Sequence, residues 1–332
     1  MSGTPIDQAK LPPPSASLLL PRVVLYLKGV AMGLGDAVPG VSGGTIAVIT
    51  NIYDELIFSI TAIDLAAVKL LFGGDIRGFW RHINGGFLLL IGLGILSGLL
   101  VSANTVLYLL ANHFTALMGF FIGLVLASSW ILKSQFNLKQ GKSYLVLLLG
   151  MMLVGALSYL NPGSGELSYL YIFLSGVVAI CAMILPGLSG AFILLLLGVL
   201  EFILQALVEI NLPYIVVFLA GCAVGLLAFS RVLAWLLKNY HQLSYGFITG
   251  MLLGSILVLW PWQQTQSFYT DSAGDMHPLQ SINVLPLNYL EITGNEPMLA
   301  ATLICLLAGL VLVNLLHWVS NATFIADAES LD

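Results

Sequence analysis

The chain has 332 residues, of which 59% are hydrophobic and 8% are charged, and its net charge at pH 7 is −5. Because a soluble domain carries roughly 25% charged residues, this composition excludes an ordinary soluble protein and indicates an integral membrane protein. The apolar runs have the length of transmembrane helices, about 20 residues, rather than that of barrel strands. We therefore expect an all-α membrane fold. Its three cysteines lie far apart without a CxxC or Cys/His cluster, so we expect no metal site, disulfide framework or cofactor.

The chain opens with a segment that does not resemble a cleaved signal peptide. Residues 1–21 contain three consecutive prolines and one cation, Lys10, and are predicted to form a disordered cytoplasmic tail. Apolar residues 23–38 lead into the break GDAVPGVSGGT (35–45), and residues 41–60 are again apolar. The pair is too long for one crossing of a core about 30 Å thick, so either a re-entrant hairpin or two short crossings is expected.

Residues 61–84 are more polar and basic, and are predicted to form an interfacial amphipathic segment. Three transmembrane helices should follow, at 85–111, 114–132 and 143–160, with a basic loop at 133–142. These elements make up a first membrane repeat, residues 22–160.

A second unit, residues 161–321, has the same order of elements. A broken hairpin is expected at 169–185 and 191–208, on either side of a PGLSG break. Three further helices are predicted at 212–237, 242–260 and 298–320. A polar loop at 261–297 precedes the last helix, and residues 322–332 should form an acidic cytoplasmic tail.

The two breaks carry the same motif. Four residues of the first recur 147 positions later, so that Pro39, Gly40, Ser42 and Gly43 correspond to Pro186, Gly187, Ser189 and Gly190. Further matches share an offset of 127, among them Gly94 with Gly221 and Gly119 with Gly246. The pattern predicts a duplication in which each half has one broken hairpin and three helices. An odd number of crossings per half makes the two halves inverted.

The cations give the orientation. With the N-terminus in the cytoplasm, all 11 Lys and Arg residues lie in or near inner segments, and the outer segments 112–113, 161–168, 209–211 and 261–297 contain none. This is the positive-inside pattern of a multi-pass protein of a cytoplasmic membrane.

The breaks are candidate anion sites, because a half-helix that starts after each break has N–H groups without intrahelical partners. The candidate binding residues are Pro39, Gly40, Ser42, Gly43, Gly44, Thr45, Pro186, Gly187, Ser189 and Gly190. The alternative interpretation is a pair of tight turns whose hydroxyl groups only cap the helices that follow.

Four charged residues deserve separate interpretation. Asp36, at membrane depth, is either a proton carrier or an acceptor for the N–H groups of its own hairpin. Glu55 is a second proton-coupling candidate, whereas Asp54 is expected to be solvated at the interface. Arg231 is the most deeply placed cation outside the hairpins, and either binds a phosphate or extends to the cytoplasmic face.

The stretches GDAVPGVSGGTIAVITNIYDELI and ICAMILPGLSGAFILLLLGVLEFIL resemble the bacterial polyprenyl-phosphate transporter family, over nearly the whole chain. The resemblance implies a protein of the inner membrane that returns undecaprenyl phosphate across that membrane for reuse in cell-envelope (peptidoglycan) synthesis. Its partners would be that lipid and the membrane lipids, with no nucleic acid and no catalytic residue. The residues that match the family motifs are Asp36, Glu55 and all ten candidate binding residues above.

Two other functions share this site chemistry. Undecaprenyl-pyrophosphate phosphatases also have inverted repeats and a PGxSRSG signature, but PGVSGG lacks the arginine that stabilises a transferring phosphoryl group, and no ExxxE pair occurs in the first hairpin. A secondary transporter of small anions would need no groove open to lipid.

Overall fold

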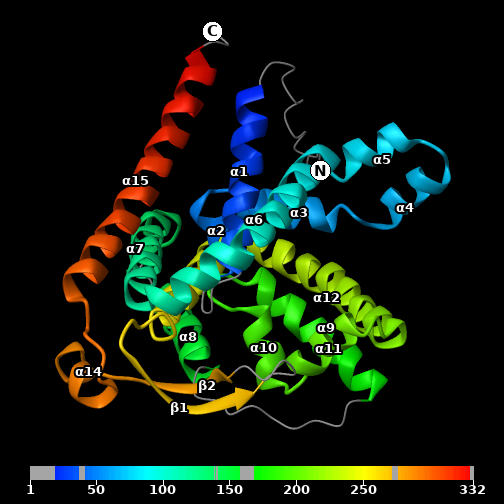
Figure 1. Ribbon diagram of the computed structural model, residues 1–332. Helices are drawn as coiled ribbons and strands as arrows, with labels where there is room; N and C mark the ends of the chain where they lie inside the picture. Colours follow the sequence, from blue (N-terminus) through cyan, green and yellow to red (C-terminus); the bar gives the residue numbers. More distant parts are fainter. Residues whose placement is uncertain are drawn as a thin grey trace.

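The structure is a computed structural model that describes residues 19–36, 42–137, 139, 141–157, 168–270 and 276–329. It is mostly helical, as the composition predicts (Figure 1). The helices up to residue 157 are α1 (Leu19–Asp36), α2 (Gly43–Ile49), α3 (Tyr53–Thr61), α4 (Leu65–Phe72), α5 (Ile76–His82), α6 (Gly85–Asn112), α7 (Phe114–Leu132) and α8 (Gly141–Leu157), with a 3₁₀ turn at Lys133–Gln135. The later elements are α9 (Tyr169–Ile184), α10 (Gly190–Leu196), α11 (Leu200–Val208), α12 (Leu212–Asn239), α13 (His241–Ser255), β1 (Gln263–Thr270), β2 (Met276–Asn283), α14 (Pro286–Thr293) and α15 (Leu299–Glu329).

Several of these helices have the length and polarity of membrane spans. Within the described part of the chain, three are long and apolar enough to cross a membrane, with spans at Gly85–Ser102, Phe114–Gln135 and Leu212–Asn239. Shorter apolar helices run over Gly141–Leu157, Tyr169–Ile184 and Leu299–Leu315. The structure is therefore compatible with a helical membrane protein.

Four helix pairs form the framework: α1 with α6, α9 with α12, α7 with α15, and α8 with α13. Glycines at each crossing bring the two backbones close together, as is common in membrane helices. A Cβ on the glycine would meet a carbonyl oxygen of the partner helix in every pair: Gly33 faces Ile95, Gly221 faces Phe173, Gly123 faces Leu306, and Gly250 faces Leu147.

The same local backbone occurs twice along the chain. Helices α2 and α10 have 7 residues each, and α3 and α11 have 9. The turns between them pass through the left-handed region at Asn51 (φ 56°) and Gly198 (φ 66°), which are 147 residues apart. Helices α6 and α12 both have 28 residues. Each ends with a 2.7 Å bond, from His113 N–H to Leu109 O and from Tyr240 N–H to Leu236 O.

The first broken hairpin, α2–α3, is packed inside the molecule. The largest buried cluster joins α2 and α3 to α7 and α13, and its fully buried side chains include Tyr53, Ile57, Met118 and Leu252. Helix α2 packs against α1 and also contacts α3, α7 and α9. Ser42, Gly43, Gly44 and Thr45 of the first motif are thus buried inside protein, where broken backbone is tolerated in a membrane.

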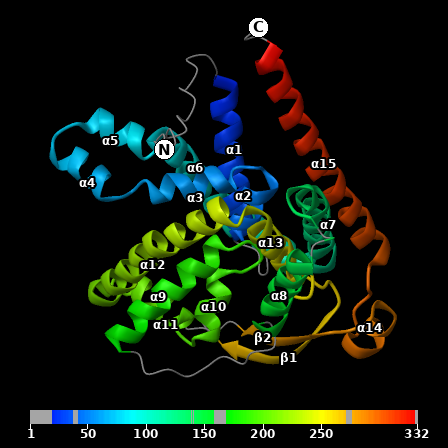
Figure 2. The ribbon, with the colours of Figure 1, turned by 180° about the vertical axis from the view of Figure 1, so that it is seen from behind.

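The polar segment at 261–297 differs from the sequence-based expectation. Residues 261–297 were predicted to be a loop in an all-α fold, but the segment contains the antiparallel pair β1–β2 and the helix α14. This hairpin lies at the end of the molecule opposite to the beginning of α1 and the end of α15 (Figures 1 and 2). Two helices also reach into the predicted tails: α1 begins at Leu19 and α15 continues to Glu329, while residues 1–18 and 330–332 lie outside the described residues.

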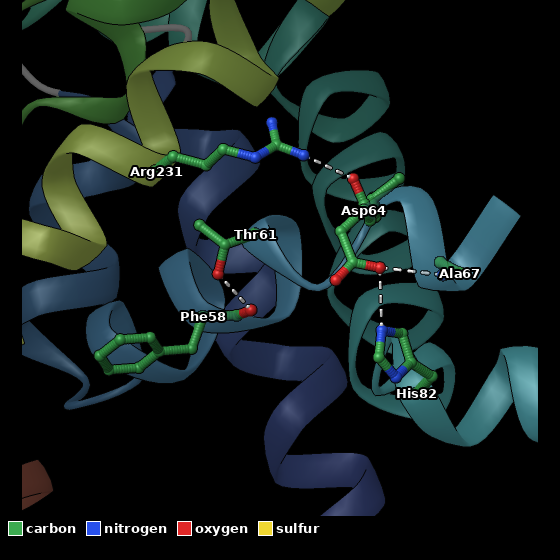
Figure 3. A network of polar contacts seen from close by, with 7 residues as sticks. Phe58, Thr61, Asp64, Ala67, His82 and Arg231 are labelled. Carbon is green, nitrogen blue, oxygen red and sulfur yellow. Dashed lines mark hydrogen bonds and ion pairs between the residues drawn. The ribbon is translucent and has the colours of Figure 1, made fainter.

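The segment predicted to be interfacial, 61–84, forms two short helices, α4 and α5. Asp64 caps α4 by accepting a hydrogen bond from Ala67 N–H at 2.9 Å, and Asp75 caps α5 by accepting one from Gly78 N–H at 2.8 Å. The Asp64 carboxylate also pairs with His82 Nε2 at 3.1 Å, which ties the end of α5 to the start of α4 (Figure 3).

We predict that α4 loses its cap in acid. The Ala67 N–H and the His82 side chain hold the pKa of Asp64 below its usual value, so the cap stabilises α4 at neutral pH and is lost as the pH falls through that lowered pKa. Hydrogen exchange of the α4 amides can be measured in lipid nanodiscs for wild type and for Asp64→Asn, whose cap does not titrate. Below about pH 4 the exchange rate in wild type should rise relative to the rate in Asp64→Asn. Asp64→Ala removes the cap, so it should lower the free energy of opening α4 by about 0.5–2 kcal/mol at all pH values. Equal acid responses of wild type and Asp64→Asn would contradict the prediction.

Candidate functional site

Each motif serine caps a short helix. Ser42 has extended backbone and accepts a hydrogen bond from Thr45 N–H at 3.2 Å at the start of α2. Ser189 does the same for α10, accepting from Phe192 N–H at 3.4 Å. Both half-helices therefore begin after the breaks as the sequence predicts, and both serines make the cap that the alternative interpretation assigned to them.

The two motifs touch each other. Ser42 Oγ donates to the carbonyl oxygen of Leu185 at 3.3 Å, and Gly187 N–H donates to Thr45 Oγ1 at 2.9 Å. Ser42 and Thr45 are 1% and 2% exposed, and their hydroxyl oxygens are 3.2 Å apart. Contacts between residues more than 140 positions apart thus join the first break to the second.

The proton positions in this contact follow from donor counting. A hydroxyl has one proton to donate. Because the Ser42 proton goes to Leu185 O, Thr45 must be the donor to Ser42. The result is a single chain of hydrogen bonds: Gly187 N–H to Thr45, Thr45 to Ser42, and Ser42 to Leu185 O.

Two glycines make this approach possible. A Cβ on Gly44 would lie 2.6 Å from Ile184 O and 3.2 Å from Met183 O, both backbone atoms at the end of α9, just before the second break. Gly187 has φ +86°, in the region that favours glycine, and its Cβ position is 2.8 Å from Met251 O. The glycines are therefore needed for close packing between the motifs and against α13.

Asp36 binds the backbone of its own hairpin. Its Oδ1 accepts a hydrogen bond from Gly43 N–H at 2.5 Å, at the N-terminal end of α2. This is the structural acceptor that the sequence offered as one of two interpretations, and it engages one of the N–H groups proposed to face an anion.

Glu55 and Arg231 lie in other contacts. Glu55 Oε1 accepts from Asn84 Nδ2 at 2.9 Å, at the start of α6. Arg231 is exposed, and its guanidinium donates to Leu227 O at 2.5 Å and to Ile63 O at 3.0 Å. Figure 3 shows it extending from α12 towards the connection between α3 and α4. Neither side chain contacts the described motif residues through a hydrogen bond.

The remaining predicted residues divide into two groups. Pro186, Gly187 and Gly190 are buried beside the contact. Gly187 and Ser189 also line a small, mainly apolar cavity, together with Val154 and Leu157 of α8 and with Val258, which follows α13. Pro39 and Gly40 lie outside the described residues.

The sequence analysis missed three polar contacts around the hairpins. Lys28 Nζ donates to Thr50 O at 2.8 Å, and Tyr171 OH donates to the equivalent oxygen in the later hairpin, Leu197 O, at 2.7 Å. Asp54, expected to be solvated, accepts from Tyr245 OH at 2.9 Å. The two carbonyl oxygens are 147 positions apart, but their donors come from different residue types, so no sequence repeat pointed to them.

The chain has relatives among known proteins. A family model described as "VCA0040-like: Undecaprenyl phosphate translocase-like" matches residues 32–277. The polyprenyl-phosphate transporter of Vibrio cholerae serotype O1 is 40% identical over 288 residues, which cover 87% of this chain and 94% of that protein. The polyprenyl-phosphate transporter of Staphylococcus aureus is 33% identical over 253 residues, 71% of this chain and 85% of that one. No solved structure is significantly similar to the chain.

Proposed function

Because this chain belongs to the VCA0040-like, undecaprenyl phosphate translocase-like family, we propose that it moves a polyprenyl phosphate of the undecaprenyl phosphate class across the bacterial inner membrane. The cargo would be carrier lipid returned for cell-envelope synthesis. The names of both relatives support a transporter rather than an enzyme.

The observation that carries the proposal is the contact between the two breaks. Two glycine-rich turns, each with a serine-capped half-helix, meet through the hydrogen bonds from Gly187 N–H to Thr45 Oγ1 and from Ser42 Oγ to Leu185 O. We propose that the phosphate binds here, at the ten motif residues named in the sequence analysis, while the hydrocarbon tail stays in lipid. Backbone N–H donors can hold an anion without a permanent buried positive charge.

Movement of the site between leaflets is proposed to use the two halves as inverted repeats. The recurring backbone of α2–α3 and α10–α11, and of α6 and α12, supports this arrangement. In repeats of this kind, rocking of one half against the other exposes a midplane site to each side in turn.

Asp36 is the proposed proton carrier. Its carboxylate accepts from Gly43 N–H, so a phosphate that takes this N–H competes with it, and two negative charges at one site repel. Uptake of a proton by Asp36 as the lipid binds would remove the repulsion and couple transport to the proton gradient. Glu55 is bonded to Asn84 instead and is the weaker candidate.

The test is transport of undecaprenyl phosphate in proteoliposomes under an imposed pH gradient. Wild type should respond to the gradient, and Asp36→Asn should still bind the lipid but lose the pH dependence. Glu55→Gln is the control and should behave as wild type. Unchanged pH dependence in Asp36→Asn would make Asp36 a structural cap only.

The same proteoliposomes separate the other two functions. Release of phosphate from undecaprenyl pyrophosphate that depends on Ser42 would support a phosphatase. Uptake of inorganic phosphate without movement of the lipid would support a small-anion transporter. Either result would overturn the proposal.

A further inference from the structure

The α4–α5 hairpin exposes several large hydrophobic side chains. Six of its large hydrophobic residues are exposed, from 44% to 86%: Leu65, Val68, Leu71, Phe72, Ile76 and Trp80. Figures 1 and 2, seen from opposite sides, both show the two helices projecting away from the rest of the molecule. Large apolar side chains gathered on one projecting pair of helices mark a site of interaction.

The same hairpin carries unpaired positive charge. Its three strong cations, Lys69, Arg77 and Arg81, make no ion pair within the described part of the chain. Its two carboxylates are already engaged, since Asp64 and Asp75 cap the helices. The surface is therefore both apolar and basic, which suits an anionic partner with a hydrocarbon interior.

The position of the hairpin along the chain indicates what that partner is. The span Gly85–Ser102 of α6 begins three residues after His82, where α5 ends. A pair of short helices joined directly to a membrane span is held at the boundary between lipid and water. Amphipathic helices with Phe or Leu on one face and Lys or Arg on the other lie in that boundary.

Two polar contacts hold the base of the α4–α5 hairpin. His82 binds Asp64 at 3.1 Å, which closes the hairpin on itself. Arg231 of α12 donates to Ile63 O at 3.0 Å, immediately before Asp64 (Figure 3). The base of the hairpin is thus attached to a helix of the later part of the chain as well as to α3.

We propose that α4 and α5 dock on the anionic surface of the lipid bilayer, with the apolar side chains among the acyl chains and Lys69, Arg77 and Arg81 on the lipid phosphates. This docking does not depend on which cargo the protein carries. It makes the hairpin a lateral anchor for the part of the protein to which Arg231 attaches it.

The experiment uses the full chain with Cys181, Cys222 and Cys305 replaced by serine, and a bimane fluorophore at Phe72→Cys. The control label is at Asn295→Cys, in the polar turn between α14 and α15, because Asn295 is exposed and lies outside any apolar helix. Both proteins are reconstituted in vesicles of phosphatidylcholine, with or without phosphatidylglycerol, that contain lipids with a doxyl quencher at a shallow position of the acyl chain.

The label at 72 should be quenched by the doxyl lipid and protected from acrylamide in water, and the label at 295 should not. Phosphatidylglycerol should strengthen quenching at 72, and 0.5 M salt should weaken it. Each change of Lys69, Arg77 or Arg81 to Gln should lower docking to anionic vesicles by roughly fivefold.

Three outcomes would overturn the proposal. The label at 72 could be quenched by acrylamide in both kinds of vesicle, which would place it in water. Its protection could depend on the number of protein molecules per vesicle rather than on the lipid, which would indicate a second copy of this chain. Docking that is unchanged in the triple Gln variant would exclude the role of charge.

Discussion

Gly44→Ala is expected to separate the two motifs and to abolish most of the transport activity. A Cβ at this position would lie 2.6 Å from Ile184 O, a distance that forces the backbone of α2 or of the second break to shift. Overpacking of this kind costs roughly 1–3 kcal/mol, and the shift also breaks the alignment of Thr45 with Gly187. We expect lower thermal stability in detergent and loss of lipid transport in proteoliposomes.

The matched control is Gly92→Ala in α6. No atom lies within 4 Å of a Cβ at Gly92, so alanine should leave packing unchanged and stabilise the helix by about 0.5–1 kcal/mol. If Gly44→Ala were as stable and as active as Gly92→Ala, the close contact between α2 and Ile184 would have no role.

Thr45→Val should also have a large effect, for a different reason. Valine has nearly the same shape but cannot accept the hydrogen bond from Gly187 N–H, and Thr45 is 2% exposed. A buried N–H without a partner costs about 1–3 kcal/mol. The free energy of unfolding and the transport rate should both fall.

Thr45→Ser distinguishes the hydroxyl from the methyl group. Serine keeps the oxygen that Gly187 N–H requires, so Thr45→Ser should remain close to wild type in both measurements. A Thr45→Ser protein as unstable as Thr45→Val would mean that packing of the methyl group, and not the hydrogen bond, holds the motifs together.

Local patterns allowed the hairpins to be predicted from the sequence. Half-helices were expected after both Pro-Gly breaks because each break interrupts an apolar run. Capping by Ser42 and Ser189 was the alternative interpretation of the motif, and both caps form. The offset of 127 residues placed α6 and α12 in equivalent positions, and they begin at Gly85 and Leu212, which differ by that offset.

Contacts to backbone oxygens could not be predicted in the same way. Arg231 donates to Ile63 O, and Ser42 donates to Leu185 O. Because every residue has a backbone carbonyl oxygen, the residue type does not indicate which oxygen will accept a hydrogen bond. The strands β1 and β2 were missed because Gln263–Thr270 is largely polar, so it was interpreted as a loop rather than as strand.

The hydrogen-bond chain between the motifs has a consequence for leakage. Its ends are backbone groups, Gly187 N–H and Leu185 O, so its direction is fixed and both hydroxyl protons are committed while the motifs touch. A passing chloride or inorganic phosphate thus finds no free hydroxyl donor on Ser42 or Thr45. An anion that is to be held by these hydroxyls must first part the two loops. In a lipid carrier, such a resting state would keep the pathway impermeable to small anions in the absence of cargo.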